Sequence, residues 1–425
     1  MYGGYRGLRR PAAVTVAAAT AVLMAACGAH VSPGHGSTPT AAAAVADCTT
    51  CYTPQQLRVA YGIQPLLGRG VTGRGQTVVL LEFPPVAGSA ATVTGASQVP
   101  AVTDIRQDLA RFDGRFSLPA ASLQVVNSLA HTASPWLATP EEVADTEIVH
   151  AIAPGAAIRE VLIPSSGTAS AGTVIAALVA ALRLGLTQGG VISLSADAGE
   201  QCFTPAAAAR VNSVLQAAQR QRVTVAVSSG DSGLQASRAT DAYLAETAWN
   251  TSPEASGGGF SKLFPRPAYQ EGTTATRGVP DVAADADPGA GMALAFSTGG
   301  AGYVLTQAGG TSVATPLWAA VIALADQYAG QDLGFVNPAL YQIGSSASYH
   351  QAFHDITTGN NTVQGIAGYQ AAPGWDPVTG WGSPDAQVLV PLLARYANEP
   401  GRQVSRPGAG TASAPPAGTP RPPAS

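Results

Sequence analysis

The sequence has little charge and almost no lysine. Charged residues make up 11% of its 425 residues, the net charge is −4, and Lys262 is the only lysine. Nucleic-acid binding depends on a basic face, so we expect no nucleic-acid partner. Glycine and proline are abundant instead, at 48 and 32 residues. Low charge with many small residues is typical of a secreted, loop-rich protein, and the length suits one large domain or two ordinary ones.

An apolar stretch near the N-terminus, residues 12–26, is short for a membrane span and follows Arg9 and Arg10. A basic segment before such a run is typical of a signal peptide. Small residues then precede Cys27, which resembles a bacterial lipoprotein signal. This predicts a signal peptide over residues 1–27 with a lipid anchor at Cys27. Ordinary secretion, with cleavage after a small residue, is the alternative, and both interpretations predict export to the cell envelope or the medium.

The segments that flank the centre of the chain are rich in Pro, Gly, Ala, Ser and Thr. This composition predicts a tether over residues 28–47 and a disordered tail over residues 399–425. The folded domain is therefore predicted to span residues 48–398.

Cysteine is rare: apart from Cys27, the chain has only Cys48, Cys51 and Cys202. Disulfides are common in exported proteins, so we expect Cys202 to pair with Cys48 or Cys51, and the sequence leaves that choice open. A redox Cys-x-x-Cys site would need a strand-to-helix context, and a zinc site would need more ligands with matching spacing. Neither is present.

Strands and helices are predicted to alternate along the folded domain. Apolar runs typical of buried strands cover residues 77–81, 158–163, 191–195 and 223–227. Stretches with helical spacing cover residues 172–184 and 206–221. This order indicates βαβ units, and so an α/β fold with a mainly parallel central sheet and helices on both faces. Active residues of such sheets gather at the carboxyl ends of strands, where we expect Gly230-Asp231 and Gly309 to Ser312.

Ser312 follows a turn of two glycines, Gly309 and Gly310, and precedes an apolar run over residues 317–325 that predicts a buried helix. A serine at a helix N-terminus sits where developing negative charge is favoured. It is either a nucleophile or a plain N-cap, and this stretch does not separate the two. Pro316 is expected in the first turn, where its missing N–H costs little.

None of the histidines is a well-supported candidate for the base that a serine nucleophile needs. His30 and His35 lie in the predicted tether, His131 and His350 have no motif around them, and His150 is predicted to be a helix residue. A histidine-based triad is therefore poorly supported.

Gly230-Asp231-Ser232-Gly233 is similar to the nucleophile motif of chymotrypsin-like proteases. Leu234-Gln235 follows where that family has Gly-Pro, and its Ala-Ala-His-Cys companion is absent. The alternating strand and helix pattern also contradicts a double β-barrel, so we reject this interpretation.

Carboxylates are better candidates for the base. Thr139 is a predicted N-cap, Pro140 the first helical residue, and Glu142 the capping-box partner three residues on. Glu141 and Asp145 are four apart, on one helical face. Taken alone, they are best interpreted as a solvated acidic face. The sharper hypothesis is a paired acid system, in which one carboxylate raises the pKa of its neighbour and creates a base suited to acidic pH.

With these residues in view, the chain resembles the sedolisins, the serine-carboxyl peptidases. The resemblance extends from residues 52–62 to residues 381–384, nearly the whole folded domain. The blocks that match in order are residues 141–145 with 153–156, Ser229 to Gly233, Ser256 to Ser261, Pro280 to Ala284, Gly310 to Ser312, and Gly374 to Pro377.

The resemblance implies a subtilisin-like fold with a different catalytic set. Ser312 would be the nucleophile, Glu141 the general base and acid, and Asp145 the residue that orients and tunes Glu141. Asp231 would line the oxyanion hole, protonated so that it donates a hydrogen bond. An ionised Asp would repel the oxyanion, so acidic working conditions are part of the expected mechanism.

The family also has a calcium site near the C-terminus. Its matching positions here are Asp355, Ile356, Ala372, Gly374 and Asp376. Carboxylates and backbone carbonyls suit a hard cation, so calcium is the expected cofactor. Ala372 stands where the family usually has Gly, a change that matters only if the backbone there needs a positive φ.

The expected function is that of an exported acid endopeptidase or tripeptidyl peptidase, a monomer that acts on protein or peptide substrates. The alternative is a catalytically idle, surface-anchored binding relative. Sedolisins usually carry a large N-terminal prodomain, and we expect none between Cys27 and the folded domain, because residues 28–47 alone separate them.

Overall fold

The structure is a computed structural model that describes residues 51–83, 105–127, 139–163, 171–196, 200, 203–231, 243–251, 254–272, 274–298, 302–363 and 365–398. The predicted signal peptide, tether and tail lie outside the described residues, as do Cys48 and Cys202. Cys51 forms a disulfide, in agreement with the predicted presence of one, and its partner lies outside the described residues.

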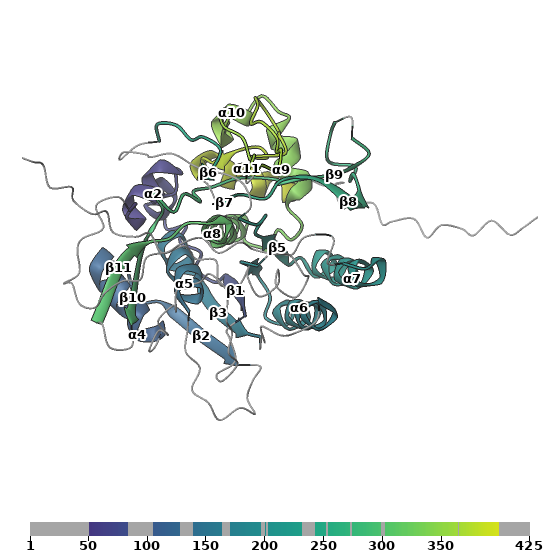
Figure 1. Cartoon of the computed structure of the whole chain (residues 1–425). Coiled ribbons are helices and arrows are strands. Elements are labelled where there is room, and N and C mark those ends of the chain that lie inside the picture. Colours follow the sequence, from purple (N-terminus) through teal and green to yellow (C-terminus); the bar gives the residue numbers. More distant parts are fainter. Residues whose placement is uncertain are drawn as a thin grey trace, which may run out of the picture.

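A five-stranded parallel sheet forms the centre of the molecule (Figure 1). Its order is β2-β3-β1-β4-β5. The strands are β1 (Thr77–Glu82), β2 (Ser122–Asn127), β3 (Ala157–Leu162), β4 (Val191–Leu194) and β5 (Thr224–Val227). The predicted α/β class is confirmed. The four strands predicted from the sequence are confirmed as β1, β3, β4 and β5. β1 is almost entirely buried, which is why its sequence is a continuous apolar run without polar alternation.

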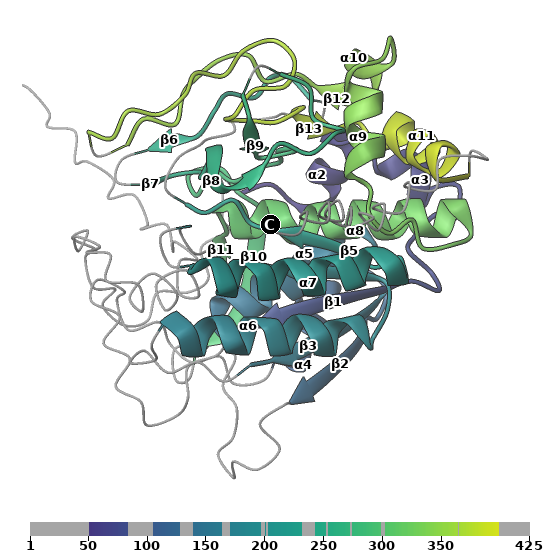
Figure 2. The same cartoon turned by 90° about the vertical axis from the view of Figure 1, so that its right-hand side faces the viewer.

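Helices cover both faces of the sheet, as predicted. One face packs against α5 (Pro140–Ile152) and α8 (Thr311–Ala329), and the other against α6 (Ala171–Leu186) and α7 (Pro205–Gln221). Figure 2 shows α6 and α7 side by side across their face. Successive residues of a strand point to opposite faces, so Val78 and Leu80 join the first core and Val79 and Leu81 the second.

The remaining elements surround this unit. The other helices are α2 (Pro54–Ala60), α3 (Gln64–Leu67), α4 (Ile105–Phe116), α9 (Asn337–Gly344), α10 (Tyr349–Ala352) and α11 (Ala386–Asn398). The other strands are β6 (Asn250–Thr251), β7 (Glu254–Ala255), β8 (Gly259–Pro265), β9 (Thr276–Val279), β10 (Ala293–Thr298), β11 (Gly302–Gln307), β12 (Phe353–His354) and β13 (Ser383–Pro384). In both views α9 to α11 lie on the side of α8 away from the sheet (Figures 1 and 2).

Two local predictions around Ser312 are wrong. The strand before Gly309 is β11, which pairs antiparallel with β10 and is not part of the parallel sheet. Pro316 does not lie in the first turn of the helix. Because α8 begins at Thr311, Pro316 is its sixth residue, inside the helix.

Among the described residues, no helix is both long enough and apolar enough to cross a lipid bilayer.

Candidate active site

Ser312 lies in the first turn of α8, buried at the helix N-terminus. Gly310 precedes the helix with a φ of 103°, which glycine adopts without strain. A Cβ on Gly310 would come within 2.8 Å of Asp231 Oδ2, so a side chain at this position would crowd the acid. The first N–H groups of a helix have no acceptor within it and form the positive end of its dipole. Negative charge that develops beside Ser312 is therefore stabilised.

Asp231 is tied to the same helix N-terminus. Its Oδ1 accepts hydrogen bonds from Thr311 N at 2.7 Å and from Thr311 Oγ1 at 2.8 Å. Its Oδ2 is buried and has no hydrogen-bond partner among the described residues. Burial raises the pKa of Asp231, and the two bonds from Thr311 oppose that rise. A proton on Asp231 therefore belongs on Oδ2, where it is available for donation.

β7 and the glycine-rich segment after it hold the backbone of Asp231 and Gly230. Ala255 N donates to Asp231 O at 2.9 Å, and Gly257 N donates to Gly230 O. A Cβ on Gly257 would lie 1.8 Å from Ser229 O, so this contact requires glycine. Two of the sequence blocks matched in order therefore pack directly on each other and position the Asp231 carboxyl.

Glu141 and Asp145 lie inside the molecule. All residues of α5 are buried, and Glu141 and Asp145 are 3% and 0% exposed. The solvated acidic face predicted from the pair alone is therefore wrong, because α5 packs against the sheet, α8, α4 and β10. The predicted helix start is confirmed, since Thr139 and Glu142 form the capping box.

Burial dominates the electrostatics of this pair. It raises the pKa of Glu141 well above its usual value, with a further rise from Asp145, while the nearby Ser312 hydroxyl lowers it. Burial also raises the pKa of Asp145 to about 7, against opposing contacts with Ser195 and Glu82. Neither oxygen of Glu141 has a hydrogen bond of ordinary geometry among the described residues.

Two further acids adjoin the pair. Glu82 ends β1 and is 2% exposed, and Glu160 in β3 is fully buried. With Glu141, Glu142 and Asp145 they form what we call the acid cluster. Burial raises the pKa of Glu82 well above its usual value, and Asp145 raises it further. The sequence interpretation missed both. For Glu82 a signal exists, because it directly follows the predicted strand, at a carboxyl end.

The histidines that the structure describes have other partners. His150 Nε2 lies 3.1 Å from Asp113 Oδ1, and burial lowers its pKa. His354 stacks on Tyr243 with the ring centroids 3.6 Å apart, and His350 packs against the neighbouring tyrosine. His30, His35 and His131 lie outside the described residues. No described histidine therefore takes the place of Glu141.

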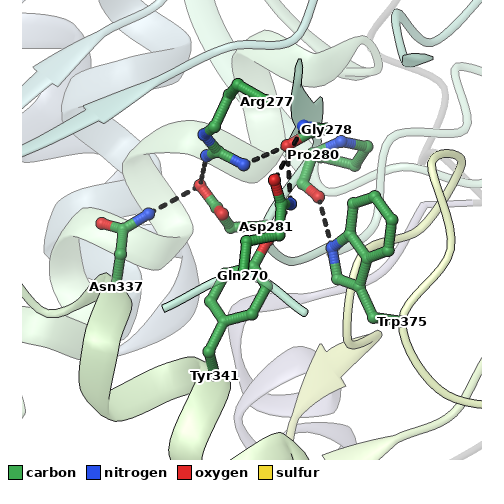
Figure 3. A network of polar contacts seen from close by, with 8 residues as sticks. All are labelled: Gln270, Arg277, Gly278, Pro280, Asp281, Asn337, Tyr341 and Trp375. Atoms are coloured by element: carbon green, nitrogen blue, oxygen red, sulfur yellow. Dashed lines mark hydrogen bonds and ion pairs between the residues drawn. The ribbon is translucent and has the colours of Figure 1, made fainter. Parts of the chain in front are cut away.

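Other matched blocks meet in a second polar network (Figure 3). Asp281 Oδ2 accepts from Arg277 Nη2 at 2.5 Å and from Asn337 Nδ2 at 2.7 Å. Trp375 Nε1 donates to Pro280 O at 3.1 Å. These contacts join the turn after β9 to α9 and to the loop around Trp375. The network therefore ties these segments to one another.

The loop around Trp375 contains the predicted calcium ligands. Gly374 N donates to both carboxyl oxygens of Asp355, at 3.2 and 3.1 Å, and Ala372 N donates to Asp376 Oδ2 at 3.0 Å. Thr379 Oγ1 links Asp376 Oδ2, at 2.9 Å, to Ile356 O, at 3.3 Å. The five predicted ligands therefore lie in two adjacent segments joined by hydrogen bonds.

The donor types in this loop fit a hard cation, because a carboxylate oxygen has lone pairs left after accepting one hydrogen bond. Only Ser117 and Arg222 have a positive φ among the described non-glycine residues, so Ala372 in place of Gly adds no backbone strain. No group of three or more His, Cys, Asp or Glu in the described part of the chain is placed to hold a metal. The predicted site would use two carboxylates and backbone carbonyls instead.

The fold and the site together define a class of protein. Ser312 lies at the N-terminus of a helix that packs on a parallel sheet, and the buried carboxyls of Glu141 and Asp231 lie beside it. This is a serine–carboxyl arrangement on an α/β scaffold.

Comparisons with known proteins agree with that class. The chain is 32% identical to kumamolisin from Bacillus sp. (strain MN-32) over 395 residues, which covers 82% of this chain and 65% of kumamolisin. It is 38% identical to sedolisin from Pseudomonas sp. (strain 101) over 157 residues, or 35% of this chain and 25% of sedolisin. It is 34% identical to mouse (Mus musculus) tripeptidyl-peptidase 1 over 166 residues, or 32% of this chain and 27% of that protein. No family model matches the chain.

A solved structure of Pseudomonas sedolisin, a serine-carboxyl proteinase complexed with pseudo-iodotyrostatin, has the same fold. Its TM-score is 0.64 at 24% identity, and the match covers 82% of this chain and 98% of that one. The chain belongs to the sedolisin family. The sequence match spans 65% of the length of kumamolisin, and the shorter match to sedolisin spans 25% of its full-length sequence.

Proposed function

We propose that this chain is an exported serine-carboxyl peptidase, an endopeptidase or a tripeptidyl peptidase, that hydrolyses peptide bonds at acidic pH. Residues 48–398 form its catalytic domain. The observation that carries the proposal is the position of Ser312 at the N-terminus of α8, beside the buried carboxyls of Glu141 and Asp231. Its family membership supports the same chemistry.

In the first half of the reaction, Ser312 Oγ attacks the carbonyl carbon of the scissile peptide and its proton passes to Glu141. Glu141 acts as a base because it shares protons with Asp145. Two carboxyls this close do not both ionise readily, so the pair holds one proton over a range of pH. The oxygen that faces Ser312 then carries the negative charge, while Asp145 retains the proton and orients Glu141.

The tetrahedral intermediate carries its negative charge on the former carbonyl oxygen. Asp231 Oδ2–H donates to this oxygen, and the positive end of the α8 dipole favours the same charge. Glu141 then returns the proton to the leaving amine as the peptide bond breaks, and an acyl-enzyme remains on Ser312. A water molecule releases the acyl group by the same steps, with Glu141 again as base and then acid. Asp231 donates only while protonated, so the reaction requires acidic pH.

The test is hydrolysis of an acid-denatured protein near pH 4 and near pH 8. We expect cleavage at the acidic pH only, and a loss of about 10⁴-fold or more in kcat for Ser312→Ala and Glu141→Gln, because removing the members of a catalytic set costs factors of this order. His150→Gln is the matched control on the same helix as Glu141, and it should keep its activity. Cleavage at alkaline pH only, or survival of activity in Glu141→Gln, would contradict the carboxyl mechanism. Absence of cleavage at both pH values would favour a surface-anchored binding protein.

The same chain is proposed to bind calcium in the loop that contains Asp355, Ile356, Ala372, Gly374 and Asp376. The ion would be held by the two carboxylates and by backbone carbonyls. When bound, it supplies a structural cross-link between the two segments and takes no part in the bond-breaking steps. Export, with a lipid anchor at Cys27, a monomeric state and the absence of a nucleic-acid partner also remain proposals, based on the sequence.

A further inference from the structure

Pro316 interrupts the hydrogen bonding of α8 next to Ser312. In an α-helix the carbonyl of residue i accepts from the N–H of residue i+4, and the residue four positions after Ser312 is Pro316. Proline has no N–H, and its ring crowds the carbonyl of residue i−4. The carbonyl of Ser312 is therefore deprived of its regular helical donor, at a buried position where such a donor matters.

Ser195 provides a donor for this carbonyl. It follows β4, is 2% exposed, and its Oγ donates to Ser312 O at 3.3 Å. The hydroxyl comes from a segment 117 residues away in the chain. A buried hydroxyl costs free energy unless it is hydrogen-bonded, so this contact satisfies both partners.

The same hydroxyl also acts on Asp145. Contact with Ser195 lowers the pKa of Asp145, against the burial that raises it to about 7. A hydroxyl has one hydrogen and two lone pairs. That hydrogen is donated to Ser312 O, and neither carboxyl oxygen of Asp145 has a hydrogen-bond partner among the described residues, so Ser195 and Asp145 are neighbours that the structure does not join by a hydrogen bond. The charged groups that face Asp145 are Glu141 and Glu142 on its own helix, and those that adjoin it from the sheet are Glu82 and Glu160.

We infer that Ser195 is a positioning residue, whose hydroxyl bonds the main-chain carbonyl of Ser312 and replaces the helical hydrogen bond that Pro316 cannot make. Ser195 touches no reacting atom. It fixes the first turn of α8, and with it the angle at which Ser312 Oγ meets Glu141. The catalytic part of this inference rests on the proposed peptidase function, whereas the hydrogen bond itself does not.

The structure offers a compensating variant and a matched control. Pro316→Ala introduces an N–H at the position from which a regular helix would bond Ser312 O. Ser193→Ala removes another buried serine hydroxyl from β4, which has no hydrogen-bond partner among the described residues. Ser195→Ala and Ser193→Ala therefore differ in the link to Ser312, although both remove a buried hydroxyl, at positions two residues apart in the chain.

The experiment is a double-mutant cycle of Ser195→Ala and Pro316→Ala in the full chain, read by the urea midpoint of unfolding. We expect Ser195→Ala to lower the midpoint and Pro316→Ala to restore most of the loss, whereas Pro316→Ala should not rescue Ser193→Ala. If Pro316→Ala changed the urea midpoint equally in the wild type and in the Ser195→Ala variant, the inference would be overturned. This cycle decides the hydrogen-bond link even if the chain cleaves no peptide.

Peptide kinetics at acidic pH provide the second measurement. We expect Ser195→Ala to lower kcat at least tenfold with KM changed less than threefold, because the substrate still binds while the nucleophile is misaligned. Pro316→Ala in that background should recover kcat. A kcat unchanged in Ser195→Ala, or an equal loss in Ser193→Ala, would overturn the positioning role.

Discussion

At the scale of single residues, the two oxygens of Asp231 have different surroundings. Oδ1 accepts from Thr311 twice, whereas Oδ2 is buried without a partner among the described residues. A neutral acid is favoured there, since burial penalises the charged form. The same side chain therefore serves two purposes: one oxygen caps α8, and the other is available to a substrate.

Asp231→Asn tests this division. An amide keeps an acceptor for Thr311 and places an N–H where the acid carries its proton, at every pH. We expect Asp231→Asn to keep kcat within about tenfold at acidic pH and to stay active to higher pH than the wild type. Asp231→Ala should lose about 10²–10³ in kcat, as when one oxyanion donor is removed. The measurement is kcat against pH, and coincident profiles for wild type and Asp231→Asn would contradict a proton-donating role.

At the scale of elements, the calcium loop is held by its own hydrogen bonds. Asp376 is 3% exposed and accepts from Val378 N and Thr379 N at 2.7 and 2.8 Å. Asp355 is less buried and contacts Gly374. Asp355 is therefore the better residue to change, because its loss disturbs fewer backbone contacts.

Removal of calcium should destabilise the protein. A ligand present at 100 times its Kd stabilises the folded state by about 2.7 kcal/mol, and about 2–4 °C of Tm accompanies each kcal/mol in a large domain. We expect a chelator to lower Tm by about 5 °C or more and added calcium to restore it, as measured by differential scanning calorimetry. The Tm of Asp355→Asn should change neither with the chelator nor with added calcium. If the wild-type Tm ignores the chelator, the loop does not hold the ion.

At the scale of the whole molecule, the fold buries many carboxyls in an apolar environment. Burial raises the pKa of Glu142 to about 8 and that of Asp145 to about 7, and it raises the pKa of Glu82, Glu147 and Glu160 well above the usual value. The neutral forms of these acids are therefore the ones that suit the folded state.

The free energy of unfolding should fall as the pH rises from about 4 to about 8. Each acid ionises near pH 4 in the unfolded chain and at higher pH in the folded one, so its contribution is complete below pH 4 and is lost as the pH rises through the folded pKa. A tenfold change in proton affinity is worth about 1.4 kcal/mol, and several groups contribute, so we expect a loss of several kcal/mol. His150, whose pKa is lowered, acts in the opposite direction.

Urea unfolding at pH 4, 6 and 8 provides this measurement. Glu160→Gln is the informative variant, because it removes one buried acid while an amide oxygen keeps the place of the atom that accepts from Thr146 Oγ1 at 3.3 Å. Its stability should depend less steeply on pH than that of the wild type. A wild-type urea midpoint that is constant from pH 4 to 8 would refute the prediction that ionisation of the buried acids destabilises the fold.

Much of the framework could be predicted from the sequence because it is locally encoded. The runs over residues 77–81 and 191–195 are apolar since a strand covered on both faces needs no polar alternation. The start of α5 could be placed at Pro140, because capping depends only on Thr139 and Glu142, three residues apart. The site roles of Ser312, Glu141, Asp145 and Asp231 were predicted through the resemblance, and they stay predictions until the variants are measured.

What could not be predicted depends on neighbours that are distant in the chain. Glu141 and Asp145 looked solvated because a four-residue spacing indicates a shared face and says nothing of what covers it. The sequence predicts Pro316 in the first turn because nothing in it marks Thr311 as the start of α8. It assigns Ser195 to a strand and does not reveal its hydrogen bond, since the partner is a carbonyl on a different element.

The sequence by itself therefore determined four of the five strands of the sheet, the helices α6 and α7 between them, the capped start of α5 and the presence of a serine at the start of a buried helix, because each follows from contacts within a few residues. Only the tertiary structure decided that the carboxyls of Glu141 and Asp145 are buried, that Asp231 caps α8 and that Ser195 donates a hydrogen bond to the carbonyl of Ser312. The physical reason is that proton affinity and hydrogen-bond satisfaction depend on burial. Burial of Glu141 beside Ser312 arises only when segments about 170 residues apart pack together.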